Sequence, residues 1–194
     1  MKKTAILQAQ DRLDRAASAI ERMQSAKKYT PYAIAWSDFL LAAGGFYSKL
    51  EQGAKGCGVS VAWVGRKKHE RKTDPLLKYL HQARNADEHG LGGTVLGLES
   101  FKIPAGNLQN LGMRVDTKGV PELALLSDPD TKLESFEFSL MLKAVHDSKH
   151  GDTFPPPTHH LGQPLHEPKA LEVALLSIKY FEAMLDEGRN LPVH

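Results

Sequence analysis

An abrupt change in residue pattern at Gly90 is the feature that most constrains how this chain can fold. Before Gly90, apolar residues recur at intervals of three and four, which is the spacing of amphipathic helices. After it, residues 90–166 hold nine glycines and seven prolines, which long helices do not tolerate. The sequence therefore predicts an α+β fold: a mainly helical up-and-down bundle with a β-rich insertion before its last helix.

Four helices are expected before this change in residue pattern. The apolar spacing predicts them over residues 4–28, 31–52, from about 60 to 72, and 75–89. Thr30-Pro31 should begin the second helix, since Thr caps a helix and Pro fits its first turn. That helix has an unusually wide apolar face, so we expect it to be central and buried, ending at Gly53. Within it, Gly44-Gly45 indicates a close crossing by another helix or a kink.

Asp74-Pro75 is the clearest start signal in the chain. Asp can cap a helix and complement its dipole while Pro occupies the first turn. The fourth helix should therefore run from Pro75 to His89 and stop at Gly90.

Strands and one last helix are expected after Gly90. Residues 136–143 alternate between apolar and polar, the period of a half-buried strand. Weaker strand patterns cover 94–103 and 122–126, and 154–157 should be extended. A final helix from 168 to 187, closed by Gly188, carries enough apolar surface to return to the bundle. We therefore divide the chain into 1–90, 91–166 and 167–194, within one structural domain.

Composition excludes several classes of protein. The single cysteine, Cys57, rules out an intramolecular disulfide and fits a reducing compartment. After Lys2-Lys3 the apolar run is too short for a secretion signal, and no stretch approaches the ~20 residues of a membrane span. We expect a cytoplasmic protein with no membrane contact. Residues 1–90 carry a net charge of +7 and the remainder −5, so the first part could face a polyanion or be a solvated bundle.

Arg84, Asn85 and His89, near the end of the fourth helix, combine residue types suited to cleaving RNA without a metal. An arginine fork binds phosphate oxygens and a histidine exchanges protons near neutral pH. His89 would act as general base on a 2′-hydroxyl or general acid on the leaving 5′-oxygen, while Arg84 stabilises the charge on the phosphoryl group. Asn85 could orient either group. No cofactor is expected.

Helix geometry places a condition on this site. Five residues at ~100° each put Arg84 and His89 about 140° apart and about 7.5 Å along the axis, so one straight helix does not aim both at one phosphate. The site would be completed in a homodimer whose fourth helices meet. In the alternative interpretation, Arg84 pairs with Glu88 across one turn and His89 is a polar residue at a helix end.

The segment Arg84-Asn85-Ala86-Asp87-Glu88-His89 resembles the signature of HEPN (higher eukaryote and prokaryote nucleotide-binding) domains: an arginine, a polar residue, three to five residues, and a histidine. The resemblance covers 4–90 and 167–188. It implies a homodimeric bundle whose active members are metal-independent endoribonucleases, often toxins or defence effectors, with an antitoxin-like protein as a partner. Arg84, Asn85 and His89 would take the motif roles. The alternative within the family is a non-catalytic module that binds RNA, a nucleotide or a protein.

Two further clusters suggest other chemistry. Five cations in seven residues could contact RNA or form a solvated face, and the lack of interleaved aromatics favours the solvated face; they are Arg66, Lys67, Lys68, Arg71 and Lys72. The insertion holds His146, His150, His159, His160 and His166. They lack a recognisable ligand spacing, so we expect no metal site and rank a histidine-dependent metalloenzyme as the weaker alternative.

Overall fold

Helices dominate the computed structural model of the chain, which describes residues 1–89, 94–102, 111–115, 121–125, 134–147, 150–166 and 169–193. The chain divides into two compact units, Met1–Leu96 with Leu140–His194, and Gly97–Ser139. The fold is α+β with helices predominating, as the sequence predicted.

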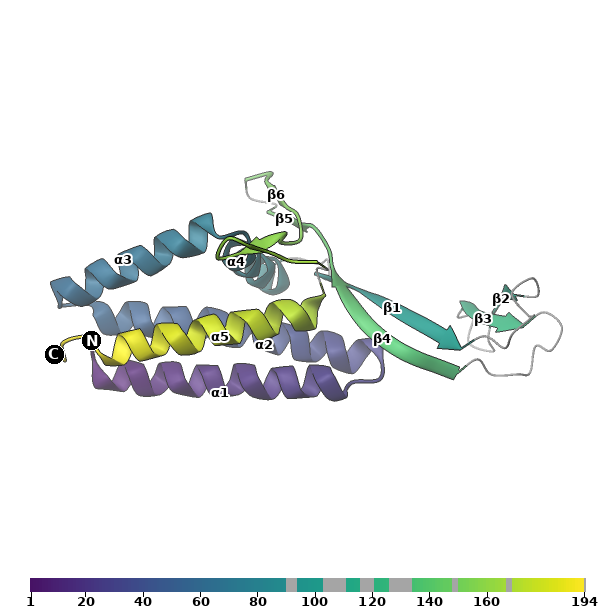
Figure 1. Cartoon of the computed structure of the whole chain (residues 1–194), viewed down its shortest axis with the longest axis horizontal. Helices are drawn as coiled ribbons and strands as arrows, with labels where there is room; N and C mark the ends of the chain where they lie inside the picture. Colours follow the sequence, from purple (N-terminus) through teal and green to yellow (C-terminus); the bar gives the residue numbers. More distant parts are fainter. Residues whose placement is uncertain are drawn as a thin grey trace. The chain divides into compact units, whose positions relative to one another are not determined.

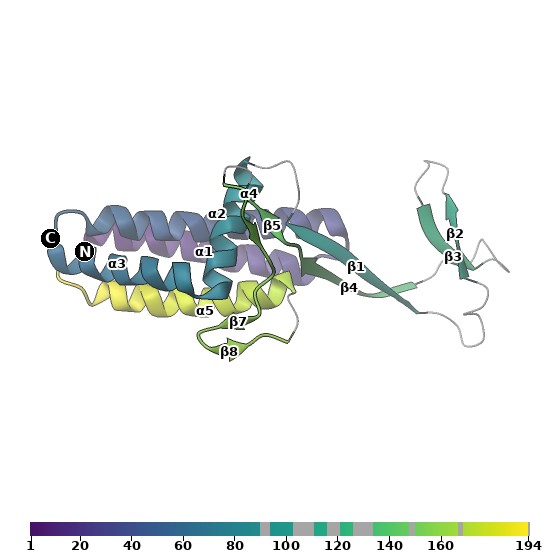
Figure 2. The same cartoon turned by 90° about the horizontal axis from the view of Figure 1, so that it is seen from above.

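Three long helices lie side by side in the first unit (Figures 1 and 2): α1 (Lys3–Ser25), α2 (Tyr29–Ala54) and α5 (Ala170–Arg189). The short link between α1 and α2 makes these two helices antiparallel. The last helix returns to the bundle, which confirms the expectation drawn from its apolar surface. Both chain ends meet at one end of the bundle, where the Met1 ammonium donates to the Pro192 carbonyl.

The second helix is central and buried, as predicted. Trp36, Phe39 and Phe46 are each at most 1% exposed, and the Phe46 ring lies 5.2 Å from that of Phe181 on α5. At Gly53, helix α2 approaches α1 closely, since a Cβ there would lie 2.2 Å from the Cβ of Ala5. Only glycine fits this approach, and the helix ends one residue later, at Ala54.

Helix α3 (Gly58–Thr73) turns sharply into α4 (Pro75–His89), whose bounds are those predicted. The Asp74 carboxylate accepts the Leu77 N–H at 2.9 Å, which confirms the expected cap. The same carboxylate accepts the Leu161 N–H at 2.7 Å and contacts His160 Nδ1 at 3.1 Å. Asp74 therefore both begins α4 and anchors the segment around Leu161 to it.

Two expected helix ends are wrong. Thr30 is not the cap of α2, because the helix begins at Tyr29 and Lys28 stands in the N-cap position without a side-chain hydrogen bond. Pro31 is still tolerated there, since first-turn N–H groups have no helical acceptor. Gly188 does not close α5 but lies buried inside it, where a Cβ would meet Ile6 at 3.3 Å and Trp63 at 3.4 Å.

Short strand pairs make up the β structure: β1 (Val95–Lys102) with β4 (Glu134–Leu142), β2 (Leu111–Val115) with β3 (Pro121–Leu125), β5 (Val145–His146) with β6 (Thr153–Phe154), and β7 (His159–His160) with β8 (Gln163–Pro164). The last three pairs are antiparallel. The strands expected over 94–103, 122–126 and 136–143 are present. No strand was expected at β2, whose alternation spans five residues and includes Gly112.

Candidate functional site

Arg84, from α4, lies against Gly44 of α2. A Cβ at position 44 would stand 3.0 Å from Arg84 Nε and 3.3 Å from its Cγ, so only glycine leaves this space open. The neighbouring Gly45 makes room for Arg12 of α1 in the same way, with Cδ at 3.0 Å. The Gly44-Gly45 pair, from which we expected a helix crossing or a kink, is thus a seat for two arginine side chains.

The Arg84 guanidinium is only partly satisfied by its neighbours. Nη2 pairs with Glu88 at 2.7 Å, and Nη1 donates to Asn85 Oδ1 at 3.3 Å. Nε is buried without a hydrogen-bond partner, whereas buried donors are normally hydrogen-bonded. The side chain as a whole is 33% exposed, and at such exposure an ion pair stabilises little. The ion pair with Glu88 is the one expected if Arg84 has only a structural role. It is present together with the unpaired Nε of Arg84.

His81 lies one helical turn before Arg84. Both residues, together with Arg71, line a narrow cavity of about 20 Å³. Partial desolvation lowers the pKa of the exposed His81 ring, and the guanidinium groups of Arg71 and Arg84 lower it further. The neutral imidazole is therefore favoured. Sequence reasoning overlooked His81, although its spacing of three from Arg84 puts both on one helix face.

The other two motif residues are less completely defined. Asn85 is half-buried and accepts from Arg84. His89 is the last residue of α4, and its side chain lies outside the described part of the structure. The end of α4 is fastened to α2 because the Ser37 hydroxyl donates to Asp87. The motif therefore sits on a helix end that the bundle holds in place.

Three of the five cations considered as RNA contacts are engaged within the bundle. Lys67 is 8% exposed and pairs with Glu187 at 2.9 Å and Glu70 at 3.2 Å. Lys68 pairs with Glu51 at 2.9 Å. Arg71 lies 3.8 Å from the same carboxylate and 4.6 Å above the Tyr47 ring. These contacts stabilise helix packing, so the charge run is not a continuous RNA-facing surface.

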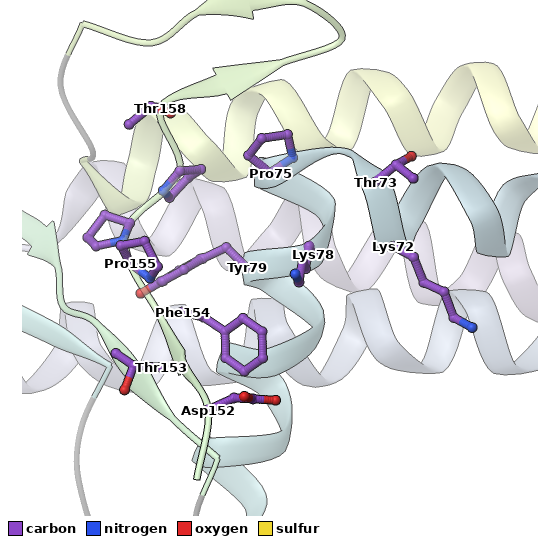
Figure 3. A pocket seen from close by; sticks show the side chains of 12 residues that line it. Lys72, Thr73, Pro75, Lys78, Tyr79, Asp152, Thr153, Phe154, Pro155 and Thr158 are labelled. Atoms are coloured by element: carbon purple, nitrogen blue, oxygen red, sulfur yellow. The ribbon is translucent and has the colours of Figure 1, made fainter. Parts of the chain in front are cut away.

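Arg66 and Lys72 are exposed and form no ion pair with the part of the chain that the structure describes. Lys72 lines a cavity of about 460 Å³ between the α3–α4 corner and β6 (Figure 3), together with Lys78 and Phe154. Neither Lys78 nor Phe154 was singled out from the sequence, because they lie 76 residues apart along the chain.

Three of the five histidines of the insertion form local hydrogen bonds, and His160 bonds to Asp74 as described above. His146 Nδ1 lies 2.9 Å from Thr153, His150 Nδ1 2.8 Å from Asp147, and His159 Nδ1 3.0 Å from Thr158. Among the described residues, no group of three or more His, Cys, Asp or Glu side chains is arranged to hold a metal ion.

Comparisons of the chain with protein-family models, with curated proteins and with solved structures found no match. Over the described residues, none of the helices combines the length and apolar character needed to cross a membrane.

Proposed function

We propose that this chain is a HEPN-like, metal-independent endoribonuclease that acts as a homodimer, with Arg84, Asn85 and His89 at its site. One observation carries the proposal: the Arg84 side chain packs on Gly44 at the end of α4, beside Asn85, and is one-third exposed. A phosphate can compete with Glu88 for the Nη groups of Arg84, because an ion pair at this exposure stabilises little.

The reaction follows from these groups. The 2′-oxygen of the substrate attacks the adjacent phosphorus, and a histidine takes its proton as the new P–O bond forms. The P–O5′ bond breaks, and the leaving oxygen receives a proton from a second histidine. Arg84 stabilises the charge that grows on the phosphoryl oxygens. We assign His89 of the two subunits to the acid and base roles, and Asn85 to orienting Arg84, whose Nη1 it already accepts.

An exposed apolar strip beside α4 supports the dimer. Ile34 and Leu41 on α2 are 56% and 42% exposed. By helical spacing they lie on the same side of α2 as Ser37 and Gly44, which contact the end of α4. A second copy covering this strip would bring its own α4 next to the first, which is the arrangement that the separation of Arg84 from His89 requires.

The test is cleavage of a mixed RNA pool by the purified chain in the presence of a chelator. We expect products with 2′,3′-cyclic phosphate or 3′-phosphate ends, and a loss of 10²- to 10⁴-fold in rate for Arg84→Ala and for His89→Ala. Arg12→Ala, which empties the seat on Gly45, is the matched control and should cleave normally. Full activity of His89→Ala, or a monomer by light scattering at micromolar concentration, would overturn the proposal.

A second candidate is a HEPN-like module that binds RNA or a nucleotide without cutting it. The ion pair between Arg84 and Glu88 favours this candidate, because it offsets part of the charge that the reaction needs. Binding of RNA by a wild-type protein that leaves the pool intact would establish this candidate over the first.

A further inference from the structure

The cavity between the α3–α4 corner and β6 combines charge, an aromatic ring and size in a way that the motif at the end of α4 does not explain. Its volume of about 460 Å³ falls in the range of small-molecule sites, roughly 300–1,000 Å³. All of its lining residues belong to one compact unit. Figure 3 shows Lys72 and Lys78 on the helices and Phe154 on the facing strand.

The two lysines of the cavity belong to the local cations that no carboxylate of the described residues pairs with. Lys72 and Lys78 are both exposed, and neither forms an ion pair with the described residues. Lys67 and Lys68, by contrast, are bound to carboxylates of the bundle. A polyanion approaching α3 therefore meets free charge at this corner of the helices.

Phe154 supplies the aromatic surface that the cationic run lacks in the sequence. Its ring is half-buried, with the Lys78 ammonium 5.3 Å from the centroid. At exposed sites such cation–π contacts are weak, and the lysine side chain is flexible. A base can take the place of the ammonium over the ring, and Lys78 can turn to the phosphate of the same nucleotide.

The cavity is connected to the motif along one face of α4. Lys78, Gln82 and Asn85 are spaced by four and three residues, so they form one stripe of the helix. Seven residues correspond to about 10 Å along the axis, a distance that a short stretch of single strand can cover. The same strand can therefore lie in the cavity and reach the end of α4.

We propose that this cavity binds one nucleotide of a single-stranded RNA, with its base stacked on Phe154 and its phosphates held by Lys72 and Lys78. The inference rests on RNA as the substrate of the proposed function, and it adds a binding site away from the cleaved bond. Asp152, also in the lining, accepts hydrogen bonds from the sugar or base and disfavours a phosphate on its side of the cavity.

The test measures binding of a fluorescent oligonucleotide with 2′-O-methyl sugars, which lacks the attacking hydroxyl, so that cleavage does not enter the result. Anisotropy titrations would use the full chain at several salt concentrations. Phe154→Leu should weaken binding by roughly five- to 150-fold, the range for one stacked base, without changing the salt dependence. Phe154→Trp should preserve binding because it keeps a stacking face.

The lysines have a different signature. Lys72→Gln with Lys78→Gln should lower the slope of log K against log salt by about 1.4, or about 0.7 for each lost phosphate contact to a single strand. Lys68→Gln, on the same helix but paired with Glu51, is the matched control and should leave the slope unchanged. Circular dichroism would check that each variant folds. If Phe154→Leu does not fold, the variants at the exposed lysines still test the inference.

Wild-type affinity and slope in both the Phe154→Leu and the double lysine variants would overturn the inference, even if the chain cleaves RNA. An equal loss in Lys68→Gln would overturn it too, because the binding would then follow overall charge. If a free mononucleotide bound as tightly as the oligonucleotide, the assignment of single-stranded RNA as the ligand would be overturned. The expected losses in a protein that cuts nothing would leave this site standing while the proposed catalysis failed.

Discussion

Substituting Gly44 by alanine separates the stability of α2 from the position of Arg84. In a helix interior, alanine is favoured over glycine by about 1 kcal/mol. The new Cβ would lie 3.0 Å from Arg84 Nε and 3.3 Å from Cγ, closer than the ~3.5–4.0 Å of an ordinary contact. Arg84 is one-third exposed and tied by a surface ion pair, so it can move by the few tenths of an ångström that this requires.

The expected result is a split between stability and function. Gly44→Ala should leave the free energy of unfolding unchanged or raise it by up to about 1 kcal/mol. RNA cleavage should fall by about three- to tenfold, because a displacement of ~1 Å in a catalytic group can cost 10²-fold and the shift expected here is a few tenths of that distance. Urea denaturation and the cleavage assay measure the two quantities on the same preparation.

Gly45→Ala is the matched control. It brings the same gain in helix propensity, and its Cβ meets Arg12 at 3.0 Å instead of Arg84. We expect the same stability and full cleavage. Equal activity of the two alanine variants, or a destabilisation beyond 1 kcal/mol in Gly44→Ala alone, would refute the reasoning. In an Arg84→Ala background Gly44→Ala should show the whole propensity gain, and a coupling below about 0.3 kcal/mol would show that the two residues do not interact.

Other contacts give predictions of their own. Asp74→Ala should lower the free energy of unfolding by about 2–4 kcal/mol in urea, because α4 loses its cap and the Leu161 N–H loses a buried acceptor; a loss below 1 kcal/mol would contradict this. The pKa of His81 is lower in the folded chain than in the unfolded one, so its contribution is present above about pH 6.5 and is lost as the pH falls through the folded value. Stability measured from pH 7 to pH 5 should therefore decline less in His81→Gln than in wild type, and parallel curves would disprove the assignment. Glu187→Ala should cost about 1–3 kcal/mol, since the buried Lys67 loses its shorter ion pair.

Helix positions could be predicted where the deciding contacts are local. Asp74 and Pro75 carry the start of α4 within one turn, and the bounds of that helix were those predicted. Gly188 shows the opposite case. Glycine ends many helices, but here it lies where α5 packs on Ile6 and Trp63, and these contacts come from distant parts of the chain. Tertiary packing therefore overrides a local signal that, taken from the sequence alone, predicts the end of a helix.

The candidate site could be predicted only in its residue types. The spacing of Arg84 and Asn85 was visible in the sequence, but the seat on Gly44 depends on how α4 meets α2. His81 was overlooked for a related reason. Its relevance comes from the guanidinium of Arg71, which another helix brings beside it.

The cationic run shows why counting charges along a chain overstates the field that a ligand meets. Lys67 and Lys68 are offset by carboxylates from α5 and α2, which pair with them at 2.9 Å, and at such distances opposite charges cancel each other's field over most of the surface. Lys72, in the same run, is not paired with a carboxylate of the described residues, because its side chain lies at the corner before α4. A charge is thus available to a ligand according to where the turn at Asp74 places it, and an RNA of the kind we propose would meet Lys72 close to Phe154, a surface on which a base can stack.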